Sequence, residues 1–166
     1  MSERNFDVGR KEFKVEIKVH GTMEQVFPLL CPEREHDYIP HWNADILWSK
    51  SGYAEEGAVF KTGDEVWIIT NHEINKNISF VRYNPDVVTK LNIDVVENDG
   101  VVKSVWTQSH VSTSTEGVSK VNEMKQEEYS KMIDSLRIMM QYYLLKGKMI
   151  TQEILEQHVG KRSHGH

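Results

Sequence analysis

Histidine is the residue of this sequence whose side chain could most readily move a proton near neutral pH. Among the eight histidines, His110 follows Trp106 and Gln108 at alternate positions. In a β-strand these three side chains share one face, where they combine an aromatic ring with polar groups. The spacing is typical of a pocket that orients a ligand, with His110 as a weak candidate for general acid or base catalysis. His110 could equally be a core histidine that a backbone carbonyl satisfies.

Two further histidines, His36 and His41, lie in a polar segment that also contains Trp42. They could form a lid over a pocket and act as a general base together with Glu33 or Glu35. The simpler interpretation is a surface loop anchored by Trp42. We favour it, because loops carry polar residues by default.

The sequence indicates no metal site and no cofactor. The histidines at positions 20, 36, 41, 72 and 110 show no ligand spacing such as His-x-x-x-His. The single cysteine, Cys31, excludes an internal disulfide framework and a cysteine-built zinc site. Its place before Pro32 at a predicted helix start could lower the pKa of the thiol, but we favour a structural thiol because no base partner is identifiable. No nucleophile elbow, phosphate-binding glycine loop or dinucleotide fingerprint is present.

Composition restricts the class of protein. The chain has 166 residues, of which 39% are hydrophobic, so it is long enough for one domain with a sizeable core. A net charge of -5 argues against nucleic acid as the main partner. No segment approaches the ~18 consecutive apolar residues of a membrane span, and residues 1–10 lack a secretory signal. We therefore predict no stable membrane insertion and one cytoplasmic domain over 11–159, with a flexible leader over 1–10 and a disordered tail over 160–166.

Strand patterns dominate the first two thirds of the chain. Apolar and polar residues alternate from Phe13 to Val19, which predicts a half-buried strand. Thr22 and Gln25 have capping-box spacing, so a short helix should begin near Met23, and a second should run over 32–36. Six further strands are predicted over 46–50, 58–61, 65–72, 78–83, 87–97 and 101–113. The short turns between them indicate an antiparallel meander.

The last third of the chain is helical in its pattern. Apolar residues recur at three- and four-residue steps from about residue 118 to residue 146, which predicts one helix roughly 40 Å long. Gly147 could end this helix as a C-cap or lie within a longer one. Between Ile138 and Leu145 only Gln141 is polar, so the helix should be covered on more than one side. The segment after Gly147 could provide that cover, or a second subunit could do so in a homodimer.

The turn at 98–100 decides which residues of the last hairpin face inward. Leu91 lies on the apolar face of the strand over 87–97. A two- or four-residue turn places Trp106, Gln108 and His110 on that same side, whereas a three-residue turn sends them outside. We predict the first arrangement, because the second would expose Trp106 and point Lys103 inward.

The segments FKVEIKVHGTMEQVFPLL, CPEREHDYIPHW and LWSKSGYAEEGAVF, followed by the meander and the long helix, resemble the SRPBCC superfamily. The resemblance covers roughly residues 11–147 and points to an uncharacterised bacterial branch. It implies an α+β helix-grip (START-like) fold, in which a curved antiparallel sheet of about seven strands wraps around a long C-terminal helix. It also implies a deep hydrophobic cavity between the sheet and that helix. It implies no single reaction, since members bind lipids, hormones or polyketides, catalyse cyclisation, or bind other proteins.

These observations predict a protein that binds a small hydrophobic or amphipathic ligand. The expected apolar wall consists of Trp67, Phe80, Leu91, Trp106, Met132, Leu136 and Met139. Gln108, His110 and Tyr143 would orient a polar head. Arg82 would join them if it points inward, where it could pair with a ligand carboxylate, with Asp94 or with Glu65. An enzyme of the polyketide cyclase or hydratase type and a protein-interaction module remain alternatives.

Overall fold

The computed structural model describes residues 8–163, with side chains through residue 159. Most of the predicted leader and the end of the predicted tail lie outside these residues. Within them, the first strand already begins at Arg10, and the last helix continues to Ser163.

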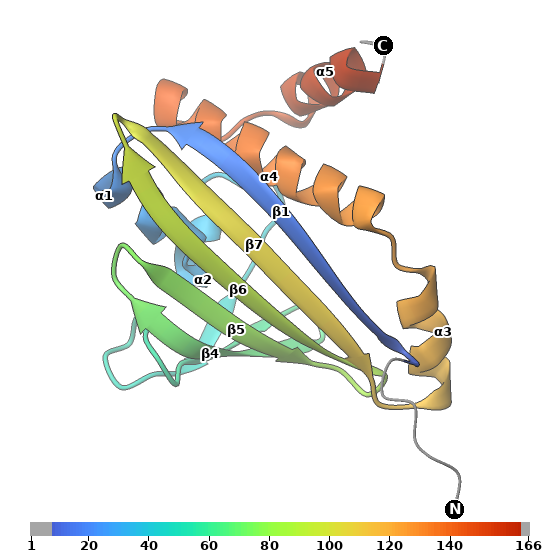
Figure 1. Cartoon of the computed structure of the whole chain (residues 1–166). Coiled ribbons are helices and arrows are strands. Elements are labelled where there is room, and N and C mark those ends of the chain that lie inside the picture. The colour runs from blue at the N-terminus through green and yellow to red at the C-terminus, as the bar shows by residue number, and fades with distance from the viewer. Residues whose placement is uncertain (1–7, 164–166) are drawn as a thin grey trace, which may run out of the picture.

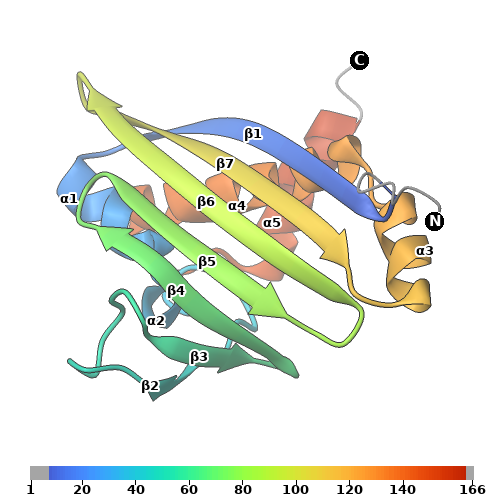
Figure 2. The same ribbon diagram turned by 60° about the horizontal axis from the view of Figure 1, so that its bottom comes forward.

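One antiparallel sheet of seven strands forms the body of the protein (Figures 1 and 2). The strands lie in the order β1-β7-β6-β5-β4-β3-β2, so that β1 pairs with β7 and the rest form a meander. Their bounds are β1 Arg10–His20, β2 Asp45–Trp48, β3 Val59–Thr62, β4 Glu65–Glu73, β5 Asn77–Tyr83, β6 Val87–Asn98 and β7 Val101–Ser112. The sheet curves around the long helix α4, and the predicted α+β architecture is confirmed (Figure 1).

The turn between β6 and β7 has two residues, as predicted. Asn98 pairs with Val101, and the intervening Asp99 and Gly100 both have positive φ, at 52° and 76°. This conformation matches the twist of a hairpin, and an Asp-Gly pair tolerates it well. The resulting register pairs Leu91 with Gln108 and places the alternate residues of β7 toward the core.

Short helices close one end of the sheet. The helix α1 (Met23–Val26) begins with the predicted capping box of Thr22 and Gln25. It is followed by the 3₁₀ helix η1 (Phe27–Leu30), in which Pro28 occupies the second position, and then by α2 (Pro32–Glu35). Proline fits the first turn of a helix because no partner is needed there for its missing N–H.

The prediction of a single long helix from residue 118 is wrong, because the structure has two helices in this segment. The helix α3 (Thr115–Glu123) lies at one end of the sheet and α4 (Gln126–Lys146) crosses its concave side (Figure 1). Met124 and Lys125 between them are extended, and the Lys11 ammonium donates hydrogen bonds to the carbonyls of Asn122 and Met124 at 2.8 and 2.7 Å. A partner from β1 therefore satisfies the last carbonyls of α3, and α4 alone spans about 30 Å.

The structure shows where α4 ends and which segment packs on its outer side. Gly147 has φ 69° and its N–H donates to the Tyr143 carbonyl at 2.8 Å, so it ends the helix as a C-cap. The chain then returns in α5 (Gln152–Ser163), which packs against α4, and Ile150 before it is 2% exposed. Of the two predicted covers for α4, the segment after Gly147 is the one present in the fold.

Candidate functional site

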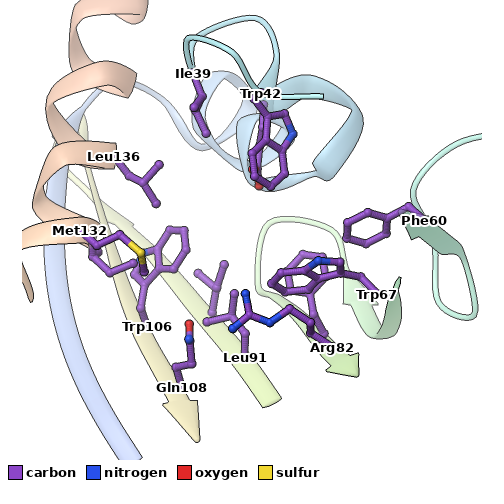
Figure 3. Close-up of a pocket in the computed structure, with 14 residues that line it drawn as sticks. Ile39, Trp42, Phe60, Trp67, Arg82, Leu91, Trp106, Gln108, Met132 and Leu136 are labelled. Atoms are coloured by element: carbon purple, nitrogen blue, oxygen red, sulfur yellow. The ribbon is translucent and has the colours of Figure 1, made fainter. Parts of the chain in front are cut away.

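A pocket of about 300 Å³ lies between the concave face of the sheet and α4 (Figure 3). We call it the central pocket. Its walls come from α2 and the loop after it, from five neighbouring strands and from one face of α4. The lining residues are Glu35, Ile39, Trp42, Phe60, Trp67, Phe80, Arg82, Leu91, Ile93, Trp106, Gln108, Met132, Ile133 and Leu136. Met132 is 49% exposed, so solvent reaches the pocket beside this residue.

The structure brings together eight of the eleven side chains predicted for the ligand site. These are Trp67, Phe80, Arg82, Leu91, Trp106, Gln108, Met132 and Leu136. Strand parity explains the residues from β4 to β7, because alternate residues of neighbouring strands share the concave face. The three- and four-residue spacing of α4 explains the other two.

His110 does not line the central pocket, in contrast to the prediction. It is 4% exposed and lies one inward position beyond Gln108 along β7, where its ring faces Phe13 of β1. Its Nδ1 is 2.9 Å from the Thr89 hydroxyl, and its Nε2 is 3.2 Å from the Gln108 amide nitrogen. Burial, with a smaller effect from the Arg82 charge, lowers the pKa of His110 to about 4. The core-histidine interpretation therefore holds, with side-chain partners in place of a backbone carbonyl.

Met139 and Tyr143 also lie away from the central pocket. Met139, two turns beyond Met132, is 7% exposed in the buried core. Tyr143 lies one turn further along α4 and lines a separate hollow near α1, together with Arg34. The residues of α4 that were predicted to line the pocket therefore form two sets. The first set faces the pocket, and the later set packs on the short helices that close the end of the sheet.

Arg82 points inward, and its guanidinium group is held on three sides. Its Nε lies 3.0 Å from a Glu65 carboxylate oxygen, although the approach is too oblique for a good hydrogen bond. The guanidinium carbon lies 4.8 Å from the centre of the Trp67 ring, and Nη2 donates to the Thr89 hydroxyl at 3.4 Å. Of the two acids considered as partners, Glu65 is the one that pairs with Arg82.

A buried chain of polar side chains links Arg82 to Gln108. It runs from Arg82 to the Thr89 hydroxyl, then to His110, and then to the Gln108 amide. If the Gln108 amide donates to Nε2, then Nδ1 carries the proton of the neutral ring and donates to Thr89. His110 therefore positions two polar side chains of the pocket from behind its wall. Figure 3 shows the Gln108 amide directed at the space between Trp106 and Arg82.

Sequence reasoning missed a group of lining residues on α2 and the loop after it. Glu35, Ile39 and Trp42 line the pocket together, but the helix ends at Glu35, so no periodic pattern in the sequence signals their shared wall. The indole N–H of Trp42 donates to the Pro32 carbonyl at 3.2 Å and anchors the loop. Phe60 was missed as well, although it pairs with Trp67 across β3 and β4 and stacks on its ring.

Glu35 is the acid of the central pocket. Glu35 is half-buried and lines the pocket. Burial alone raises the pKa of this carboxyl well above its usual value of 4.5.

The two histidines considered as a lid do not reach the pocket. His36 is exposed and its Nε2 lies 3.2 Å from a carboxylate oxygen of Asp37. His41 is exposed and has φ 63°. Only Trp42 of this segment, with Ile39, contributes to the wall, as expected for a surface loop anchored by that ring.

Cys31 has the surroundings of a structural thiol. It is 7% exposed, and its Sγ lies 3.9 Å from Nε2 of His72. Burial raises the pKa of the thiol to about 12, and the negative charges of Glu33 and Glu35 act in the same direction. A thiol with so high a pKa is a poor nucleophile near neutral pH.

Among the described residues, no three His, Cys, Asp or Glu side chains lie close enough together to hold a metal ion. No helix in this part of the chain is long and apolar enough to cross a membrane.

Comparison of the sequence with family models and with curated proteins finds no match. Solved structures do match. Ginseng major latex-like protein 151 from Panax ginseng has a TM-score of 0.62 at 10% identity, over 81% of this chain and 97% of that one. Norcoclaurine synthase from Thalictrum flavum has a TM-score of 0.57 at 16% identity, over 89% and 96% of the two chains. CalU16 from Micromonospora echinospora has a TM-score of 0.55 at 13% identity, over 92% and 86%.

Proposed function

The chain has the helix-grip fold of the SRPBCC superfamily, and from this premise we propose that it binds a small amphipathic molecule in the central pocket. The observation that carries the proposal is a space of about 300 Å³ with aromatic and aliphatic walls and few polar groups. Pockets of this kind bind small molecules through apolar contact and use a few polar groups to orient them. The norcoclaurine synthase structure contains dopamine and hydroxybenzaldehyde, so in that protein the same fold accepts small aromatic compounds.

The polar side of the pocket supports an amphipathic ligand over a purely apolar one. Arg82 keeps guanidinium donors beyond those used by Glu65 and Thr89, and the Gln108 amide faces the same space. The chain through Thr89 and His110 holds both groups in place before a ligand arrives. Such preorganisation reduces the entropy lost on binding. We expect an oxygen-bearing group of the ligand to lie here, with its apolar body against Trp106 and Leu136.

Binding is favoured over the cyclase or hydratase alternative. That alternative needed His110 or a lid histidine to transfer a proton to the substrate. His110 lies behind Gln108 with both ring nitrogens in contact with side chains, and His36 and His41 are exposed outside the pocket.

One observation supports the alternative of a protein-interaction module. Trp48 and Ile68 on the outer face of the sheet are 62% and 42% exposed, and both pair with Val59 between them. Val66 and Tyr83 form the adjacent exposed pair. An apolar surface of this kind suits contact with another protein, including a second copy of the chain. Sedimentation velocity tests the homodimer, and a mass that stays monomeric at every concentration would remove it.

Native mass spectrometry of freshly purified protein, followed by denaturing extraction, tests the binding proposal. We expect a stoichiometric adduct of a small molecule on the wild-type chain. Leu136→Trp fills the pocket from α4 and should abolish the adduct. Leu145→Trp, on the same helix but at a position 72% exposed, should retain it. A clean apo mass, with no thermal stabilisation by a panel of lipids and polyketides, would refute the proposal.

A further inference from the structure

Among the described residues that line the central pocket, Glu35 has the only carboxyl group. Arg82 has Glu65 and Thr89, and Gln108 has His110. Among the described residues, no side chain forms a hydrogen bond or an ion pair with the Glu35 carboxyl, although this residue lines the pocket. A buried carboxylate without a partner is unfavourable, so a partner that enters the pocket would gain from meeting it.

Arg82 does not supply the missing positive charge. Its ion pair among the described residues is with Glu65, at 3.0 Å. Burial lowers the pKa of Arg82, and the charge of Glu65 opposes that shift. Arg82 and Glu35 both line the pocket, so each can meet a different group of one ligand.

The walls of the pocket suit an organic cation. Trp42 lines the pocket together with Glu35, and Phe60, Trp67 and Trp106 contribute further rings. The faces of such rings attract cations, and Arg82 over Trp67 at 4.8 Å already shows this interaction inside the pocket. A carboxylate beside aromatic rings recognises a protonated amine by an ion pair and by cation–π contact together.

We propose that Glu35 anchors a protonated amine of the ligand, so that the central pocket takes an aromatic or aliphatic amine whose oxygen-bearing end lies toward Arg82 and Gln108. The inference rests on the proposed function, since it assumes that the pocket holds a ligand. It adds a chemical class, a basic nitrogen, and a second anchoring residue.

Binding of an amine to Glu35 releases a proton at any pH at which the empty pocket holds the neutral acid. In the empty pocket, burial favours the neutral carboxylic acid. The ammonium group of the ligand favours the carboxylate, so the acid gives its proton to solvent and an ion pair forms. The affinity for an amine should therefore rise with pH between the usual pKa of a carboxyl and its raised value in the empty pocket, and should fall again once the amine itself loses its proton.

The other titratable groups around Glu35 do not produce this pH dependence. Burial raises the pKa of the Tyr38 phenol well above its usual value, and the pKa of Cys31 is about 12. Arg82, across the pocket, stays charged and paired with Glu65. The wall from α4 is apolar, with Met132, Ile133 and Leu136. His110, behind Gln108, titrates at about 4.

Three probes with one apolar body separate the outcomes: naphthylethylamine, naphthylethanol and naphthylacetate. Isothermal titration calorimetry on the intact chain measures the affinity for each from about pH 6 to about pH 9. Buffers of different ionisation enthalpy then give the number of protons released. We expect the wild type at about pH 8 to bind the amine at least about tenfold more tightly than the alcohol, and we expect proton release at the lower end of the pH range for the amine only.

Two variants test whether the preference for the amine depends on Glu35. Glu35→Gln keeps the size of the side chain and should bring the amine to within about threefold of the alcohol, without weakening the alcohol and without proton release. Glu33→Gln removes a neighbouring carboxyl of α2 that does not line the pocket, and should behave as the wild type.

The outcomes distinguish this inference from the proposed function. If amine and alcohol bind equally well, or if Glu35→Gln leaves the preference for the amine intact, the assignment of Glu35 is refuted and the binding function stands. If naphthylacetate binds best, the pocket selects anions and the inference is again refuted. If no probe binds and the native protein carries no adduct, both the proposed function and the inference are refuted.

Discussion

Replacing His110 with glutamine tests whether this residue is a neutral structural group behind the pocket wall. His110 is 4% exposed and both ring nitrogens face side-chain partners, Thr89 and Gln108. Glutamine offers a donor and an acceptor of similar reach, so His110→Gln should still fold. What it removes is the imidazole, whose pKa is about 4 in the folded protein.

The size of the pH-dependent change in the free energy of unfolding follows from the two pKa values of the imidazole. The pKa is about 4 in the folded protein and about 6.5 in the unfolded chain. Between these values the unfolded chain binds more protons, so the free energy of unfolding falls as the pH drops through this window. At about 1.4 kcal/mol for each pH unit, the loss attributable to His110 is about 3 kcal/mol. It is fully developed only below about pH 4.

Urea denaturation at a series of pH values from about 4 to about 7.5 measures this loss. The stability of the wild type relative to His110→Gln should decrease by about 3 kcal/mol from the top of the range to the bottom. Glu35 titrates with the opposite sign, since its raised pKa favours the folded state at low pH, but it is common to both proteins and cancels in the difference.

Parallel stability curves for His110→Gln and the wild type would refute the reasoning. So would an imidazole pKa near 6.5 measured by NMR in the folded protein. Either result would mean that His110 is charged or solvated near neutral pH, and its role as a proton-transfer group would have to be reconsidered.

Three further predictions concern the elements that position the site. Gly117→Ala should lower stability by about 1–3 kcal/mol, because a Cβ there would collide with the backbone carbonyl of Asp86, and an unchanged urea midpoint would contradict that close approach. Thr22→Ala removes one half of the capping box with Gln25 and should lower stability by about 1 kcal/mol, with Gln25→Ala giving a loss in the same direction. Ile133→Ala, at a position 1% exposed on the pocket wall, should lower stability by about 2–5 kcal/mol in thermal or urea unfolding, and a loss well below 1 kcal/mol would show that the site collapses.

The local pattern of the sequence was sufficient for the architecture. Alternation over β1 and the capping box at Thr22 each involve only a few consecutive residues, and both are present as predicted. The inward face of β7 was predicted because the alternative would have exposed Trp106, and the two-residue turn at Asp99-Gly100 gives that face. Because parity within a hairpin follows from its turn, Trp106 and Gln108 could be assigned to the pocket wall before any tertiary contact was known.

Contacts between distant elements decided the limits of the helices and the partners of the polar groups. The extended residues between α3 and α4 depend on Lys11 of β1, more than one hundred positions away, so no periodicity within the helical segment signals them. The choice of Glu65 for Arg82 depends on the pairing of β4 with β5, which follows from neither residue alone.

The chemical character of the pocket also depended on tertiary structure. The sequence placed His110 on the same face as Gln108, and this was correct, but the pocket ends between them and His110 is buried behind the wall. Glu35 was considered only as a partner of the lid histidines, whereas packing made it part of the pocket wall and raised the pKa of its carboxyl by burial. Side-chain direction along a strand is a local property that the sequence determines. The depth of a side chain and the identity of its partners are set by how separate elements pack together, and only the folded chain decides them.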